Sequence, residues 1–221
     1  MQIAIDGPSG SGKSTIAKIL AKTLGIVYVN TGALYRAVGF HAQNVGASLD
    51  DEAALVAAMD LLNLRIQYLD GVQHIYANEQ DVTTAIRTAQ AGMAASDVAR
   101  FEGIRLRVVN VIQGLASEQS VIMDGRDIGT VVLPRADVKI FLTASVEARA
   151  ARRVGELEQL GQTADFDDIA KQIATRDEQD TSRAASPLKQ ADDAVLLDTT
   201  ALNIEETIEA ILAIIKNKGL I

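Results

Sequence analysis

The stretch "GPSGSGKS", residues 7–14, determines the fold of this 221-residue chain. It fits the pattern G-x-x-x-x-G-K-[ST], it follows a short apolar run, and a helical pattern of apolar residues comes after it. Glycines allow backbone N–H groups to point inward around phosphate oxygens, and a helix N-terminus adds partial positive charge. The stretch therefore predicts a loop that binds the phosphates of a nucleotide.

In such a loop the lysine reaches the β- and γ-phosphates, and the hydroxyl group that follows it ligates Mg²⁺. We therefore expect Lys13 to act in catalysis and Ser14 to bind the metal ion. The whole motif is assigned to nucleotide binding: Gly7, Pro8, Ser9, Gly10, Ser11, Gly12, Lys13 and Ser14.

Five apolar runs are too short for helices and show little alternation, which is typical of strands buried on both faces. Helical patterns separate several of them, and this order predicts an α/β fold with a parallel sheet and helices on both faces. The runs are 2–5, 26–29, 120–123, 138–142 and 194–197.

Two segments depart from this pattern. In "LRIQYLDGVQHIYA" (64–77) apolar and polar residues alternate around Asp70-Gly71, which predicts an antiparallel hairpin inserted between the second and third core strands. The segment "GELEQLGQTADFDD" (155–168) is polar and contains two glycines, so we expect a mobile excursion between helices.

The composition limits the classes of function. The chain is 48% apolar and 23% charged with a net charge of −8, which predicts one globular domain and argues against binding to nucleic-acid backbones. Arginine outnumbers lysine, 13 to 8, and most arginines fall in short clusters, which favours local sites for small anions. The chain has no cysteine, so thiolate chemistry and disulfides are excluded.

The sequence also shows no signal peptide and no apolar run of the roughly 20 residues that span a membrane. We therefore expect a soluble cytoplasmic protein without a membrane partner. An acidic surface and the lack of an obvious large apolar face favour a monomer.

The phosphate-binding loop alone does not identify the reaction. A regulatory GTPase should carry D-x-x-G and N-K-x-D, but no Asp has Gly three residues later and Asn217-Lys218 precedes Gly219-Leu220. Nothing in the sequence supports a mechanical ATPase or translocase. A kinase for a small molecule needs a second anion site and a cover that excludes water, and clustered arginines meet this requirement.

Polar clusters follow two of the expected strands. In "NTGALYR" (30–36) Thr31 is a candidate helix N-cap, which would place Arg36 close to the ligand edge of the sheet. In "MDGRDIGT" (123–130) three charges follow a buried run, and Asp124, which ends that run, is the best candidate to hold Mg²⁺ or its water.

Two further clusters lie on expected helices. In "RDEQDTSR" (176–183) Arg176, Asp180 and Arg183 share one helix face, which fits either a surface ion-pair stripe or a site. In "EARAARR" (147–153) three arginines precede the polar excursion, and like charges so close together favour a phosphate clamp at the hinge of a lid.

Taken in order, these motifs resemble those of the bacterial cytidylate kinases over essentially the whole chain. The resemblance implies a P-loop kinase unit with a five-stranded parallel sheet, made of a core (1–32, 101–154 and 167–221), an acceptor-binding insertion with a small antiparallel sheet (33–100) and a short lid (155–166). The motifs are "IDGPSGSGKST", "NTGALYR", "MDGRDIGT", "VKIFLTAS", "EARAARR", "RDEQDTSR" followed by "SPLK", and "LLDTT".

The resemblance implies transfer of a phosphoryl group from ATP, with Mg²⁺, to CMP or dCMP, and it assigns roles. Thr15 joins the ATP-binding loop. Arg36, Arg126 and Arg183 would bind the CMP phosphate. Ser96, Arg105 and Asp127 would read cytosine. Arg176 would lie near the transferring group and Asp180 on the ribose, and Thr31 and Tyr35 complete the acceptor site. Lys13, Arg126, Arg176 and Arg183 would be the catalytic residues.

The sequence departs from the family pattern in one respect, and this leaves undecided which arginine at the lid binds ATP. The segment 155–168 contains no arginine, so the ATP clamp must come from the hinges, where Arg149, Arg152, Arg153 and Arg176 are the candidates. Kinases for UMP, AMP or shikimate, and a non-catalytic nucleotide-binding module, are the alternatives.

Overall fold

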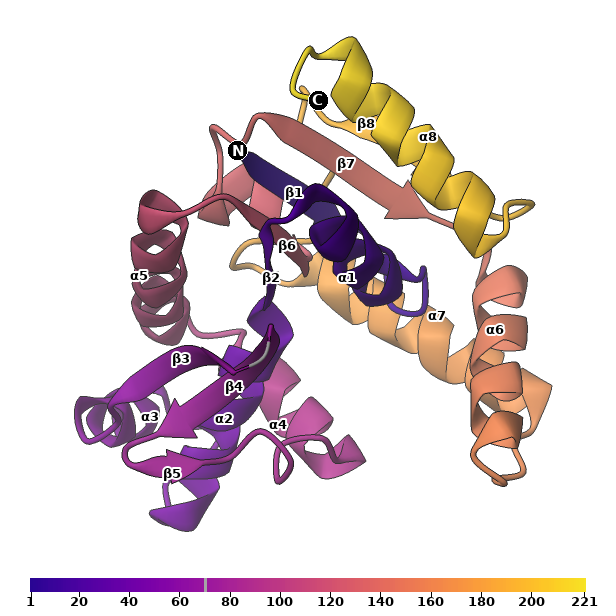
Figure 1. Cartoon of the computed structure of the whole chain (residues 1–221). Helices are drawn as coiled ribbons and strands as arrows, with labels where there is room; N and C mark the ends of the chain where they lie inside the picture. Colours follow the sequence, from indigo (N-terminus) through magenta and orange to yellow (C-terminus); the bar gives the residue numbers. More distant parts are fainter. Residues whose placement is uncertain (70) are drawn as a thin grey trace. The chain divides into compact units, whose positions relative to one another are not determined.

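A computed structural model describes residues 1–69 and 71–221, so Asp70 of the expected Asp70-Gly71 turn lies outside the described residues. The chain forms two compact units. The first combines Met1–Ile26 with Ser120–Ile221, and the second comprises Val27–Gln119 (Figure 1). No helix within the described ranges is long and apolar enough to cross a bilayer.

The main sheet contains five strands in the described part of the chain, in the order β2-β6-β1-β7-β8, and this confirms the expected five-stranded sheet. The central strand β1 runs parallel to both of its neighbours, and β7 runs parallel to β8. The strands are β1 (Gln2–Asp6), β2 (Val27–Asn30), β6 (Val121–Gly125), β7 (Val138–Thr143) and β8 (Val195–Asp198).

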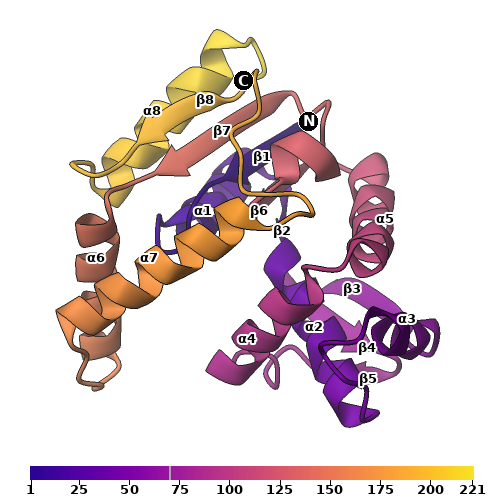
Figure 2. The same cartoon turned by 180° about the vertical axis from the view of Figure 1, so that it is seen from behind.

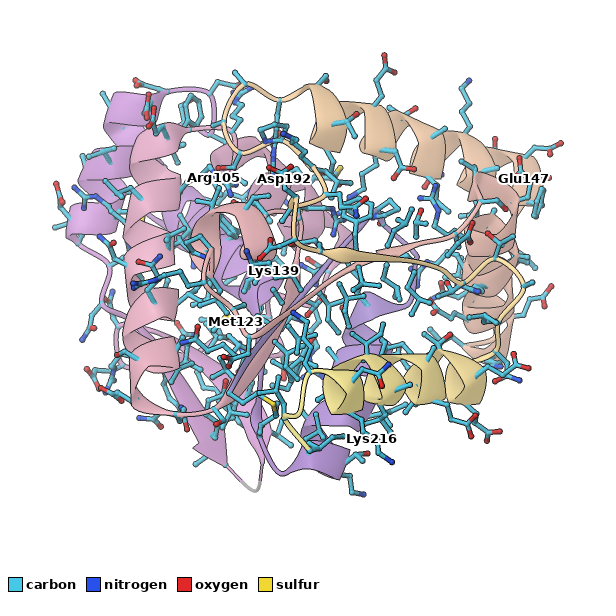
Figure 3. The ribbon with its side chains drawn as sticks, turned by 90° about the horizontal axis from the view of Figure 1, so that it is seen from above. Arg105, Met123, Lys139, Glu147, Asp192 and Lys216 are labelled. Carbon is cyan, nitrogen blue, oxygen red and sulfur yellow. The ribbon has the colours of Figure 1, made fainter. Side chains whose placement is uncertain are left out.

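The interior of the first unit explains why its central strands lack alternation. Ile3 and Ile5 of β1 and Ile122 and Met123 of β6 are all fully buried, because side chains on both faces of the sheet are covered. Helices α1 (Lys13–Leu24) and α8 (Ile204–Asn217) lie on one face of this sheet, and α7 (Phe166–Ser182) lies on the other (Figures 1 and 2). Figure 3 shows the side chains that fill these layers, with Met123 among the strands.

The polar excursion expected at 155–168 is mostly helical. Helix α6 (Val146–Gln159) continues into it, and α7 begins at Phe166, so that only six residues connect the two helices. The Asp165 side chain accepts a hydrogen bond from the Asp168 N–H and caps α7, while Glu, Leu and Gln residues favour continuation of α6.

The second unit contains the inserted antiparallel sheet that the sequence predicts. Strands β3 (Leu64–Leu69), β4 (Val72–Ala77) and β5 (Gln80–Asp81) pair in the order β3-β4-β5. Leu64 pairs with Ala77, and Leu69 pairs with Val72. The helices of this unit are α2 (Thr31–Asn44), α3 (Glu52–Asp60), α4 (Ala89–Val98) and α5 (Glu102–Glu118).

A glycine allows α2 and α4 to pack closely. A Cβ atom added to Gly39 of α2 would lie 2.8 Å from the Ala94 Cβ and 3.1 Å from the Ala94 carbonyl carbon. Gly114 of α5 is also helical, but no atom outside its own helix lies within 4 Å of an added Cβ. Substitution of alanine at these two glycines therefore distinguishes two effects of an added methyl group: steric overlap with a neighbouring helix at Gly39, and helix propensity alone at Gly114.

We expect Gly39→Ala to lower the free energy of unfolding by about 1–2 kcal/mol, because overpacking against Ala94 exceeds the gain in helix propensity. Gly114→Ala should raise it by up to about 1 kcal/mol, since only the propensity term acts. Urea unfolding of both variants measures these changes. If both variants changed the free energy of unfolding by the same amount and in the same direction, the packing argument would be contradicted.

Candidate active site

The phosphate-binding loop lies between β1 and α1, as its motif predicts. Gly7 has φ of 150°, and a Cβ atom there would lie 1.9 Å from the Leu142 carbonyl oxygen on β7. Gly12 has φ of 87° and precedes the first residue of α1. Only glycine meets both conditions without strain, so the loop conformation follows directly from its sequence.

Lys13 is folded over the loop and is 5% exposed. Its ammonium group donates hydrogen bonds to the Pro8 carbonyl oxygen at 2.5 Å and to the Ser11 hydroxyl at 3.2 Å. The pKa of Lys13 lies well below its ordinary value. Burial is the main cause, and the nearby positive charge of Arg126 lowers the pKa further. Asp124, Asp6 and Asp180 oppose this shift, so the ammonium group lies in a cluster of mixed charge.

Ser14 joins the loop to the neighbouring strand. Its hydroxyl group donates a hydrogen bond of 2.6 Å to the Asp124 carboxylate on β6. A serine hydroxyl and a buried carboxylate are hard oxygen ligands, and Mg²⁺ in nucleotide sites uses one or two such groups together with phosphates and water. The chemistry of this pair fits that ion.

The turn after β6 is held by Asp6, a residue that the sequence analysis does not assign. Its two carboxylate oxygens accept hydrogen bonds from the backbone N–H groups of Ile128 and Gly129, at 2.8 and 2.7 Å. Burial raises the pKa of Asp6 to about 6, the nearby Asp127 also raises it, and the two N–H donors and Lys13 lower it. A polar residue at the end of a buried strand is the signal that could have identified Asp6, as it does Asp124.

Helix α7 brings its charged residues to this turn. The Arg126 Nε donates a 2.5 Å hydrogen bond to the Asp180 carboxylate, and Arg183 lies 3.9 Å from Asp127. The Arg183 Nε also donates to the Ser186 carbonyl oxygen at 2.6 Å. Four residues assigned to the acceptor are thus close together: Arg126, Asp127, Asp180 and Arg183. Asp180 and Arg183 are half-buried, so this part of "RDEQDTSR" is not a solvent-exposed stripe of ion pairs.

The four arginines that are candidates for the lid hinge have different surroundings. Arg149 is 3% exposed and donates to the Ser9 carbonyl oxygen at 2.9 Å and to the Asp177 carboxylate at 2.6 Å. Arg152 donates to the main chain of Thr199 and Leu202. Arg153 and Arg176 are side chains on α6 and α7 with greater exposure; Arg153 pairs with Glu156.

The remaining residues that the resemblance assigns to the acceptor lie in the second unit, on α2, α4 and α5. Tyr35 is buried, and its ring lies 5.5 Å from the Arg105 guanidinium carbon. Arg36 donates to the Ile86 carbonyl oxygen at 3.5 Å, and the Ser96 hydroxyl donates to Gly92 at 3.4 Å. Arg105 also donates to the Ala99 carbonyl oxygen at 3.2 Å.

The start of α2 corrects one expectation. Thr31 is the first helical residue, not the N-cap; Asn30 is the N-cap, and its side chain accepts a hydrogen bond from the Ala33 N–H at 3.1 Å. Both residue types cap helices well, and Asn30 has the extended backbone that a cap requires.

The protein is a P-loop kinase. This class is defined by the fold together with the glycine-rich loop and its lysine, the serine–aspartate pair, and the arginines paired with carboxylates. A family model described as "Cytidylate kinase" matches residues 3–217. The chain belongs to the cytidylate kinase family.

Individual relatives agree with this assignment. A cytidylate kinase from Exiguobacterium sp. is 46% identical over 96% of this chain and 94% of its own length. A cytidylate kinase from Bacillus licheniformis is 47% identical over 98% and 96%. The fold is similar to that of an uncharacterized protein from Eubacterium ventriosum, with a TM-score of 0.54, 15% identity and 98% coverage of both chains.

The raised pKa of Asp6 predicts a dependence of stability on pH. Because the folded protein holds this proton up to a pH of about 6, and the unfolded chain only to 3.8, wild-type stability relative to Asp6→Asn should fall as pH rises through that window. The change corresponds to roughly 3 kcal/mol at most. Unfolding experiments at pH 4 to 7 measure it.

Asp193→Asn is the control for this experiment. The Lys139 ammonium donates to the Asp193 carboxylate and lowers its pKa, so the gain in stability relative to this variant is complete by about pH 4. The difference between the wild type and Asp193→Asn should therefore stay constant between pH 4 and 7. A pH-independent difference for Asp6→Asn would show that Asp6 titrates in the same way in both states.

Proposed function

We propose that this protein transfers the γ-phosphoryl group of ATP to CMP or dCMP, giving ADP and CDP or dCDP. Family membership carries this proposal, because the family model and the relatives named cytidylate kinase match nearly the whole chain. The paired arginines and carboxylates around the phosphate-binding loop support the same reaction class. No observation favours UMP, AMP or shikimate as acceptor, or a non-catalytic module.

Residues 7–15 bind the ATP phosphates in this proposal. Backbone N–H groups of the loop and the N-terminus of α1 face the anion. Lys13 exchanges the Pro8 carbonyl oxygen and the Ser11 hydroxyl for phosphate oxygens. Because a phosphate supplies the negative charge that the buried ammonium group lacks, binding raises the Lys13 pKa and keeps the side chain cationic.

Ser14 and Asp124 are the proposed ligands of Mg²⁺, since their oxygens already lie within a hydrogen bond of each other. When bound, the ion neutralises charge on the β- and γ-phosphate oxygens. Asp124 is buried at the end of β6, so the position of its carboxylate is fixed by the strand pairing of Ile5 with Asp124.

Arg36, Arg126 and Arg183 are the proposed ligands of the CMP phosphate, because guanidinium groups bind phosphate in a bidentate manner. Carboxylates hold two of them: Asp180 pairs with Arg126, and Asp127 lies beside Arg183. These pairs orient the arginines before the acceptor arrives and reduce the cost of ordering them. Asp180 is also the proposed partner of the ribose.

Asp127, Ser96 and Arg105 are the proposed readers of cytosine, and Thr31 and Tyr35 support the same site. A carboxylate accepts a hydrogen bond from the exocyclic amine of cytosine, whereas uracil presents a carbonyl oxygen there and is repelled. Discrimination between CMP and UMP therefore depends on the charge of Asp127.

The phosphoryl transfer itself requires alignment and charge neutralisation rather than covalent catalysis. Lys13, Arg126, Arg176 and Arg183 supply cations around the transferring group, and no obligate general base is assigned. Arg149, Arg152, Arg153 and Arg176 are the proposed candidates for the clamp on ATP. Arg149 and Arg152 also donate hydrogen bonds to protein groups, which hold them beside the loop and β8.

We also propose that 155–166 acts as a lid over a core of 1–32, 101–154 and 167–221, with acceptor-binding residues in 33–100. Closure of such a segment excludes water, which otherwise hydrolyses ATP without transfer. A cytoplasmic monomer that binds neither nucleic acid nor membrane is the proposed state, in keeping with the net charge of −8.

Measurement of ADP release with Mg-ATP and a panel of acceptors tests the proposed reaction. We expect turnover with CMP and dCMP, and little with UMP, AMP or shikimate. Lys13→Ala should reduce kcat/KM for CMP on the order of 10³-fold, because transition-state charge loses a cation. Absence of acceptor-dependent turnover in the wild type would overturn the proposal.

The role of Asp127 has a separate test. Asp127→Ala should lower the ratio of kcat/KM for CMP to that for UMP by about 10–100-fold, since a base contact is worth roughly 1–3 kcal/mol. The KM for ATP should change by less than about twofold. A CMP/UMP ratio equal to that of the wild type would exclude base reading by Asp127.

A further inference from the structure

The inserted sheet has no role in the chemistry described so far. None of the acceptor residues assigned in the second unit lies on β3, β4 or β5; they lie on α2, α4 and α5. A sheet that supplies no ligand can still serve the site by holding the elements that do.

Gln73 of β4 binds the main chain of Asn30 at both of its polar groups. The Gln73 carboxamide oxygen accepts a hydrogen bond from the Asn30 N–H at 2.7 Å, and its amide nitrogen donates to the Asn30 carbonyl oxygen at 3.3 Å. A side-chain amide in this position imitates a neighbouring strand, because it presents one acceptor and one donor to the same residue.

A second side chain of the inserted sheet binds the same strand. The Tyr68 hydroxyl group of β3 donates a hydrogen bond of 3.0 Å to the Tyr28 carbonyl oxygen. Burial raises the pKa of Tyr68, so the phenol remains a donor at all physiological pH values. The inserted sheet therefore holds β2 at Tyr28 and, two residues later, at Asn30.

Asn30 is the point at which β2 becomes α2. Its backbone is extended, its side chain caps α2 through the Ala33 N–H, and Thr31 is the first helical residue. Tyr35 and Arg36 follow within the next turns. Because a rotation at Asn30 would swing the whole helix, a contact that fixes both polar groups of Asn30 also fixes the direction in which α2 leaves the strand.

We infer that Gln73 is a positioning residue for the acceptor site: it clamps the Asn30 peptide groups and so sets the position of Arg36. This inference rests on the proposed role of Arg36 in binding the acceptor phosphate. The inserted sheet then acts as the support of the acceptor helix. Gln73 itself need not contact any substrate.

The test replaces Gln73 by methionine, which has nearly the same length and keeps the packing but offers neither hydrogen bond. Gln67→Met is the matched control, because Gln67 lies on β3 of the same sheet with an exposed side chain. Steady-state kinetics with ATP and CMP, together with amide hydrogen exchange at Asn30, are measured for both variants and the wild type.

We expect Gln73→Met to raise the KM for CMP by about tenfold, which corresponds to about 1.4 kcal/mol, because the two hydrogen bonds that position the helix are lost. The KM for ATP should stay within about twofold, and the Asn30 amide should exchange faster. Gln67→Met should match the wild type in all three measurements. The separation of the two KM values is what a general loss of stability would not produce.

Gln73→Glu provides a second variant, because it keeps the acceptor for the Asn30 N–H and replaces the donor by a carboxylate oxygen that faces the Asn30 carbonyl oxygen. Asn30 should remain protected from exchange, and the KM for CMP should lie between those of the wild type and Gln73→Met. Unchanged CMP kinetics in Gln73→Met, or equal increases in both KM values, would overturn the inference. A wild type without CMP-dependent turnover would instead overturn the proposed function, and the two failures are therefore distinct.

Discussion

The parallel pairing of β1 with β6 concentrates negative charge at one edge of the sheet. Asp6 ends β1, Asp124 lies opposite Ile5, and Asp127 follows after a single turn. All three are buried, and the nearby charge of Asp127 adds to burial in raising the pKa of Asp6, while two backbone N–H donors and Lys13 lower it. Much of the surrounding structure consists of such compensation.

The compensating groups come from different parts of the first unit. Lys13 comes from the glycine-rich loop, Arg126 from the turn itself and Arg183 from the end of α7, while Ile128 and Gly129 contribute backbone donors. Arg126 is therefore already paired with Asp180, and Arg183 lies beside Asp127, whereas the buried Lys13 ammonium remains short of negative charge. Under the proposed function, phosphates would compete with carboxylates for cations that are already in position, which avoids the cost of assembling them.

Sequence patterns predicted the features that depend on neighbouring residues. The loop motif, the five strands and the hairpin at 64–77 all have local signatures, and the structure has them at those positions. Burial on both faces was wrong for β8, because it lies at the edge of the sheet with Val195 37% and Leu196 56% exposed. The N-cap of α2 was assigned one residue too late because Asn30 and Thr31 are both good caps.

The roles that depend on contacts between distant residues could not be predicted in this way. The hydrogen bonds of Asp6 to Ile128 and of Gln73 to Asn30 join residues 122 and 43 positions apart, and no spacing rule connects them. Arginine spacing in "EARAARR" likewise suggested three phosphate ligands. It did not reveal that Arg149 and Arg152 donate to carbonyl oxygens of the protein, which only the packing of α6 determines.

The chain order of the two units has a consequence for synthesis on the ribosome. The first unit contains both chain ends, and its central strand pairs Gln2 with Val121, so β1 leaves the ribosome long before its partner exists. At roughly 5–20 residues per second, this strand waits on the order of ten seconds. The second unit, Val27–Gln119, is continuous and has its own buried core, so it can fold during that interval. Throughout that interval the apolar side chains of β1 lack the partner strand that covers them in the folded protein.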